Sequence, residues 1–127
     1  MITEDYVSFE TAKMLKEKGF PQSTFRCHYI IDGNVHYKSF ENRCGFGDYD
    51  IIAPTLAVAM KWLREVHNIC ITIYPDKENG YEAVLYNIKD DVEIILQSFG
   101  IYGSHIFEDS YEEAVEAALK YCLENLI

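Results

Sequence analysis

Four residues of the kinds that bind metals lie near one another in the first third of the chain: Cys27, His28, His36 and Cys44. Structural zinc is usually held by pairs spaced C-x2–4-C or H-x3–5-H, and neither spacing occurs here. If an even-length turn joins the strands that carry His28 and His36, their side chains point to opposite faces, whereas an odd-length turn reverses this. We therefore expect no metal site and interpret these residues as ordinary strand residues.

The other groups that could do chemistry are isolated. His67 falls in the last turn of a predicted helix, where a histidine commonly caps carbonyl groups. His105 could activate a thiol, but nothing in the sequence places a cysteine beside it. Asp48 and Asp50 lack the further oxygen ligands of a calcium loop. No motif of a serine hydrolase, zinc protease, P-loop or dinucleotide-binding turn occurs, so no catalytic residue and no cofactor are expected.

The charge of the chain limits its partners. Acidic residues outnumber basic ones by 21 to 11, and the formal net charge is −10. Such a charge repels nucleic-acid phosphates and anionic membranes, so we expect neither as a partner. It suits a basic protein partner or, less often, a protein that mimics the charge of nucleic acid.

Length and composition predict one domain, residues 1–127. The hydrophobic fraction of 49% is enough for a core without disulfides. Cys27, Cys44, Cys70 and Cys122 are far apart, and we expect four free thiols. No segment approaches the roughly 20 apolar residues of a membrane span, and the N-terminus lacks the features of a signal peptide. These features predict a cytoplasmic protein.

The hydrophobic pattern predicts the following elements in order. They are a helix over Val7–Phe20, a hairpin over Thr24–Phe40, a helix from Pro54 to Asn68, strands over Ile69–Tyr74 and Tyr81–Lys89, a strand with a break or bulge over Val92–Phe107, and a helix from Ser110 to about Leu126. The turns among the last three strands are too short for parallel crossovers. We therefore expect an α+β fold of order α-β-β-α-β-β-β-α, with an antiparallel sheet of about five strands and three helices packed on it.

Local signals mark the helix ends. Ser8 is a good N-cap for the first helix, and Gly19 followed by Phe20 predicts a Schellman stop. Pro54 is tolerated in a first helical turn, and Asn68 suits a left-handed stop. Ser110 opens the capping box S-Y-E-E of the last helix.

The central predicted helix has an apolar arc that a single sheet does not cover. The arc holds Leu56, Ala59, Met60, Leu63 and Val66, and it widens further with Val58 and Trp62. The last helix has a similarly wide apolar face, which reaches Tyr121 on one flank and Leu123 on the other. The residues of this face are Tyr111, Ala114, Val115, Ala118, Leu119, Cys122 and Leu126. We therefore name Val58, Trp62 and Tyr121 as a possible interaction surface. Either the helices cover one another and the protein is a monomer, or a second copy covers this surface in a homodimer.

Two short likenesses concern the last helix. SYEEAVEAALKYCLENL is similar to the helix that follows a three-stranded meander in double-stranded-RNA-binding domains. Those domains begin this helix with lysines that grip phosphates, whereas this chain has Tyr111, Glu112 and Glu113, which repel RNA. The segment Phe107–Leu119 also resembles part of the small antitoxins of the HicB type.

A resemblance over most of the chain is carried by three segments in order, YVSFETAKMLKEKGF, APTLAVAMKWLREVHNI and SYEEAVEAALKYCLENLI. Together they resemble a group of short uncharacterised proteins encoded in prophages and mobile elements of gut bacteria. The resemblance implies a phage or mobile-element origin and brings no activity or catalytic residues.

The sequence therefore predicts a non-enzymatic protein-interaction module, which would modulate a host or phage protein. One alternative is a small enzyme that uses Cys44 or His105 around the loop Glu41–Asp50. Another is an acidic mimic of nucleic acid.

Overall fold

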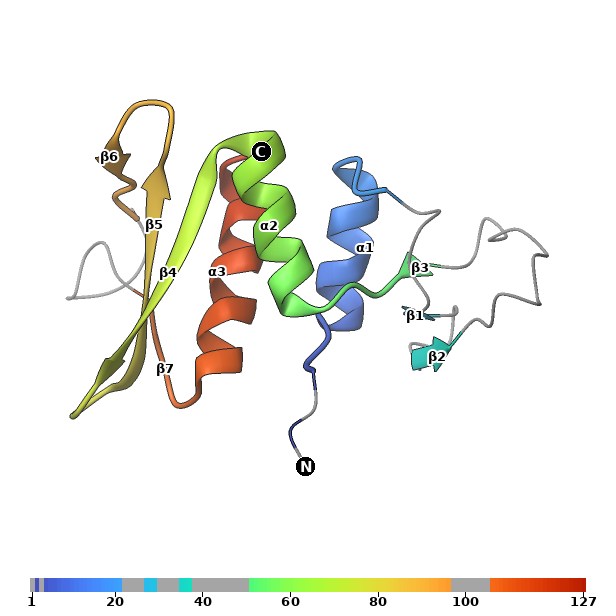
Figure 1. The fold of residues 1–127 in the computed structure, drawn as a ribbon, viewed down its shortest axis with the longest axis horizontal. Helices are drawn as coiled ribbons and strands as arrows, with labels where there is room; N and C mark the ends of the chain where they lie inside the picture. The colour runs from blue at the N-terminus through green and yellow to red at the C-terminus, as the bar shows by residue number, and fades with distance from the viewer. Residues whose placement is uncertain (1, 3, 22–26, 30–34, 38–50, 97–105) are drawn as a thin grey trace.

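The structure is a computed structural model that describes residues 2, 4–21, 27–29, 35–37, 51–96 and 106–127. Its elements are α1 (Phe9–Glu17), β1 (Cys27–Tyr29), β2 (Val35–Tyr37), β3 (Ile51–Ile52), α2 (Leu56–His67), β4 (Ile69–Asp76), β5 (Gly80–Asn87), β6 (Val92–Glu93), β7 (Ile106–Glu108) and α3 (Tyr111–Asn125). Figure 1 shows the three helices between a larger sheet and a smaller one. The predicted α+β class, with three helices and an antiparallel sheet, is confirmed.

The larger sheet is organised around β5. This strand pairs antiparallel with all eight residues of β4 on one side. On its other side it pairs first with β6 and then with β7. Ile94 N donates to Leu85 O at 2.8 Å, so the ladder continues past the end of β6. β6 and β7 therefore pair with two successive parts of the same edge of β5. This confirms the predicted break within Val92–Phe107.

The smaller sheet has the order β2-β1-β3. The predicted hairpin is confirmed by the antiparallel pairing of β1 and β2, while its expected turn at Asp32–Asn34 lies outside the described residues. We did not predict β3, because two isoleucines are too short a run to show a period. The register sets His28 directly opposite His36. This register leaves an odd number of residues between the two strands, so the odd-length alternative applies and the objection based on an even-length turn does not hold.

The ends of α1 follow the local signals. Ser8 is the N-cap, and its hydroxyl accepts a hydrogen bond from Thr11 N at 3.2 Å. At the other end Gly19 adopts a φ of 93°, and Phe20 N donates to Leu15 O at 2.9 Å. These bonds confirm the predicted Schellman stop.

α2 differs from its prediction at the start and agrees at the end. Thr55 is the N-cap and accepts from Val58 N at 3.2 Å, so Pro54 precedes the cap instead of lying in the first turn. Asn68 ends the helix in the left-handed conformation, as predicted. Val66 was expected in the buried arc but is 57% exposed, because it lies in the last turn, past the residues that the core encloses.

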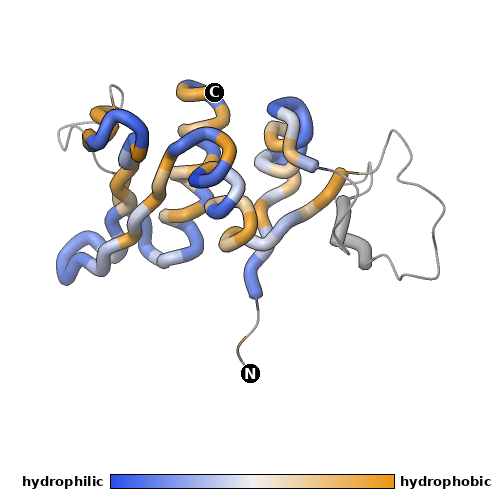
Figure 2. Tube along the Cα trace, turned by 45° about the horizontal axis from the view of Figure 1, so that its top comes forward, coloured by the Kyte–Doolittle hydropathy of each residue, from blue (hydrophilic) through white to orange (hydrophobic). Residues whose placement is uncertain are grey.

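α3 lies at the centre of the fold, against α1, α2 and the larger sheet (Figure 1). Its N-cap is Ser110, which accepts from Glu113 N at 3.1 Å as the capping box predicts. Leu123, expected only at the flank of the apolar face, is buried in the core. Tyr111 and Leu126, expected within that face, are exposed instead. Figure 2 shows hydrophilic residues at the outer turns, including the β4–β5 turn, and hydrophobic ones along the packed strands and helices.

Candidate functional site

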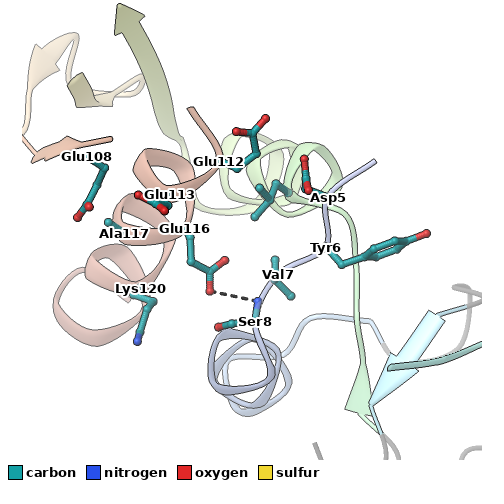
Figure 3. A pocket seen from close by; sticks show the side chains of 11 residues that line it. Asp5, Tyr6, Val7, Ser8, Glu108, Glu112, Glu113, Glu116, Ala117 and Lys120 are labelled. Carbon is teal, nitrogen blue, oxygen red and sulfur yellow. Dashed lines mark hydrogen bonds between the residues drawn. The ribbon is translucent and has the colours of Figure 1, made fainter. Parts of the chain in front are cut away.

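An acidic pocket opens where the segment before α1 meets α3, next to the start of α2 and the end of β7 (Figure 3). Its volume is about 530 Å³. Most of its lining side chains are charged. The acidic ones are Asp5, Glu108, Glu112, Glu113 and Glu116, the basic one is Lys120, and the rest are Tyr6, Val7, Ser8, Leu56 and Ala117. We refer to this hollow as the acidic pocket.

Backbone hydrogen bonds hold the N-terminal wall of the pocket in place. Val7 N donates to Pro54 O at 3.0 Å, and Leu56 N donates to Asp5 O at 2.9 Å. The side chain of Val7 is fully buried. The segment before α1 is therefore tied to the start of α2, which fixes the position of Asp5.

The opposite wall comes from the first turns of α3 and from the end of β7. Glu112 and Glu113 lie in the first turn, where the positive end of the helix dipole favours acidic residues. This preference alone explains why a helix begins with two glutamates. It does not explain Glu108, which comes from β7 and adds a third carboxylate to the same wall.

Glu116 is committed to holding two helices together. Its Oε1 accepts hydrogen bonds from Ser8 N at 3.1 Å and from Thr11 Oγ1 at 2.5 Å. Thr11 is fully buried, so its hydroxyl requires a partner inside the protein. The carboxylate also lies at the N-terminus of α1, where the helix dipole stabilises a negative charge. We therefore assign Glu116 a structural role in joining α1 to α3.

Lys120 does not neutralise the pocket, because it is already paired. Its Nζ lies 3.1 Å from Glu10 Oε2. This hydrogen bond is the main reason that the pKa of Lys120 is raised, and the negative charges of Glu124 and Glu116 act in the same direction. Within the described residues no basic side chain forms an ion pair with Asp5, Glu108, Glu112 or Glu113.

The excess negative charge acts on Glu108. Desolvation is the largest cause that raises the pKa of this carboxyl, and the nearby charges of Glu113 and Asp109 raise it further. Glu108 and Glu113 therefore repel each other across this wall. A positive group placed among them would relieve that repulsion.

The described residues provide little for enzyme chemistry. Cys122 is fully buried, and this burial raises the pKa of its thiol to about 12, so it is not a nucleophile. Cys70 is free and half-buried on β4. His67 packs edge-on against Trp62 with ring centroids 4.6 Å apart, and its buried Nε2 has no hydrogen-bond partner among the described residues. No group of three or more metal-binding side chains occurs among the residues that the structure describes.

The residues predicted as an interaction surface do not gather at the acidic pocket. The side chain of Trp62 is 9% exposed, and its ring packs edge-on against the ring of Phe20 with centroids 5.4 Å apart. The chain itself therefore covers most of Trp62. Val58 and Tyr121 are half-buried against the same core. The alternative enzyme site, with Cys44, His105 and the loop Glu41–Asp50, lies outside the described residues, as do Asp48 and Asp50.

The sequence did not reveal the pocket, although it held a usable signal. Acidic residues cluster in the N-terminal segment and again around the start of the last helix, but only the tertiary fold brings these two regions together. In comparisons with family models, curated proteins and solved structures, nothing matches the chain. No helix in the described part of the chain is long and apolar enough to cross a membrane.

Proposed function

We propose that this protein is a non-enzymatic interaction module whose acidic pocket binds a lysine- or arginine-bearing segment of a partner protein. The observation that carries the proposal is the group of four carboxylates without an ion-pair partner among the described residues, Asp5, Glu108, Glu112 and Glu113, around one hollow. A basic side chain entering this hollow meets several of them at once.

We expect the binding free energy to come from the cluster of carboxylates rather than from any single ion pair. An isolated surface ion pair contributes about 0.2–1 kcal/mol. Several carboxylates around one concave site also steer a basic segment toward it and increase its association rate. The pKa of Glu108 is raised mainly by desolvation and further by the charges of Glu113 and Asp109, and a bound cation offsets the repulsive part. Affinity should therefore fall steeply with added salt.

The resemblance of three segments to proteins of prophages and mobile elements supports a partner that is a host or phage protein. A protein acting in that setting works in the cytoplasm, where it would meet basic proteins that handle nucleic acid. Nucleic acid itself is not the proposed ligand, because its phosphates would meet the carboxylates of the pocket.

A peptide titration tests the proposal. A short fluorescent peptide with alternating lysine and arginine should bind the protein, and a glutamate peptide of the same length should not. The double variant Glu112→Gln and Glu113→Gln should weaken binding about tenfold, which corresponds to the loss of two surface ion pairs.

The matched control is the double variant Glu65→Gln and Glu78→Gln, which removes the same charge from exposed positions away from the pocket. It should leave the affinity within about twofold of the wild type, because distant charges are screened. If both double variants weaken binding equally, the peptide responds to net charge alone and the pocket is not the binding site.

A further inference from the structure

In the part of the chain that the structure describes, the outer edge of β4, the last strand of the larger sheet, is not paired. Within the described residues β4 pairs only with β5. Ile88 N donates to Asn68 O at 2.8 Å, and hydrogen-bonded pairs alternate along an antiparallel ladder. The even-numbered residues of β4 therefore bond to β5, and Ile69, Ile71 and Ile73 direct their N–H and C=O groups to the open edge.

Over Ile69–Tyr74 this edge lacks the features that usually keep strand edges apart. Natural edge strands are often protected by lysines, prolines or bulges. The run Ile69–Tyr74 carries no charge, and its register with β5 has no bulge. Pro75 stands only at the end of the run. In a chain of net charge −10, this uncharged strand is a surface on which two copies can meet without direct repulsion.

We propose that a second copy of this chain pairs with β4, edge to edge and antiparallel, about a two-fold axis at Ile71. In this register Ile71 lies opposite Ile71 of the second copy, and Ile69 lies opposite Ile73. About six backbone hydrogen bonds form between the two strands. Pro75, which has no N–H to donate, stays outside the paired segment.

The strand fits a second copy better than it fits the basic segment proposed for the acidic pocket. A basic segment would find no carboxylate along Ile69–Tyr74. A second copy matches it by symmetry, because the same outward N–H and C=O groups stand on both strands. On the helix-covered face isoleucine then meets isoleucine, and on the other face Cys70 meets Thr72.

A designed disulfide tests the register. Cys70 and Thr72 of the second copy form a pair without hydrogen bonds between them, whose Cα atoms lie about 4.5 Å apart, within the range of a disulfide. In a background with Cys27→Ser and Cys44→Ser, the variant Thr72→Cys should form a covalent dimer with two bridges when oxidised glutathione accepts the electrons. The matched variant Tyr74→Cys should not cross-link. Cross-linking of Tyr74→Cys alone would overturn the register about Ile71, and no cross-linking of either would overturn the paired edge.

Light scattering tests the pairing without any new thiol. The wild-type protein at tens of micromolar should have the mass of two chains. Ile73→Pro removes one outward N–H and keeps the bonds to β5, so it should be folded by circular dichroism and have the mass of one chain. A monomeric wild type, or a folded Ile73→Pro that remains a dimer, would overturn the proposal. If Ile73→Pro does not fold, the wild-type mass and the cross-linking result still decide.

Discussion

The acidic pocket and the open edge of β4 are opposites in chemistry. The pocket is concave, is lined by carboxylates and draws its residues from four separate parts of the chain. The edge is a single strand, carries no charge from Ile69 to Tyr74 and offers backbone groups. The difference shows that the net charge of −10 is not spread evenly. Where carboxylates gather, a basic partner fits, and where they are absent, a second copy fits.

A second contrast lies inside the pocket itself. Glu112 and Glu116 are one turn apart on α3, and both line the hollow. Glu116 accepts hydrogen bonds from Ser8 and Thr11, whereas no hydrogen bond of the Glu112 side chain joins it to another described residue. One carboxylate therefore holds the fold together, and the other is available to a ligand.

The largest effect is expected at Gly80, which pairs with the end of β4 and approaches Glu108 of the pocket. This residue begins β5 in the β4–β5 hairpin. A Cβ added there would collide with the carbonyl oxygen of Glu108, a residue of the pocket. Its φ of 86° adds strain for any side chain. Gly80→Ala should reduce the free energy of unfolding by about 3 kcal/mol, part from the left-handed backbone and part from the collision. Urea denaturation measures this loss.

Gly19→Ala is the matched control. Gly19 has a similar φ of 93°, but an added Cβ meets no atom within 4 Å. Gly19→Ala should reduce the free energy of unfolding by about 1 kcal/mol, because only the backbone conformation is strained. Equal losses of unfolding free energy for the two variants would contradict the close approach of Gly80 to Glu108. They would also remove the evidence for a link between the β4–β5 hairpin and the pocket.

An intermediate effect is expected for Glu116→Gln. The change removes the charge from the two hydrogen bonds that join α3 to α1, and it should lower the free energy of unfolding by about 1.5 kcal/mol. Glu112→Gln on the same helix should change it by no more than about 0.5 kcal/mol. Thermal unfolding of both variants compares them. Similar losses would mean that Glu116 has no special structural role.

The smallest effect concerns pH and Glu108. Since its pKa is raised, the folded state holds this proton more tightly than the unfolded state does. The carboxyl therefore opposes folding once the pH rises through the range between its ordinary and its raised pKa. Glu108→Gln should be more stable than the wild type at neutral pH by a few tenths of a kcal/mol, because the residue is only half-buried and solvent screens its charge. The difference should vanish in acid, and a difference that grows in acid would contradict the assigned direction.

The sequence predicted most of the elements because their signals are local. The cap at Ser8, the stop at Gly19 and the left-handed Asn68 each depend on a few neighbouring residues. The exposure of Val66 could not be predicted in this way, because it depends on where the core ends rather than on helical periodicity.

The acidic pocket was beyond sequence reasoning for a similar reason. Asp5 and Glu112 are far apart in the chain, and only the packing of α1 and α2 against α3 brings them to one hollow. Glu116 shows the same limit, because its partners Ser8 and Thr11 lie in another helix and its cap.

The most direct test of the acidic pocket as a binding site is a residue-by-residue NMR titration with the lysine- and arginine-containing peptide. We predict that the amide signals of Asp5, Glu108, Glu112, Glu113 and Lys120 move together along one binding curve, and that added salt reverses the shifts. The signals of Ile69–Tyr74 should stay in place. Shifts that leave the pocket residues unmoved, or that spread evenly over all acidic residues, would contradict the proposed binding site.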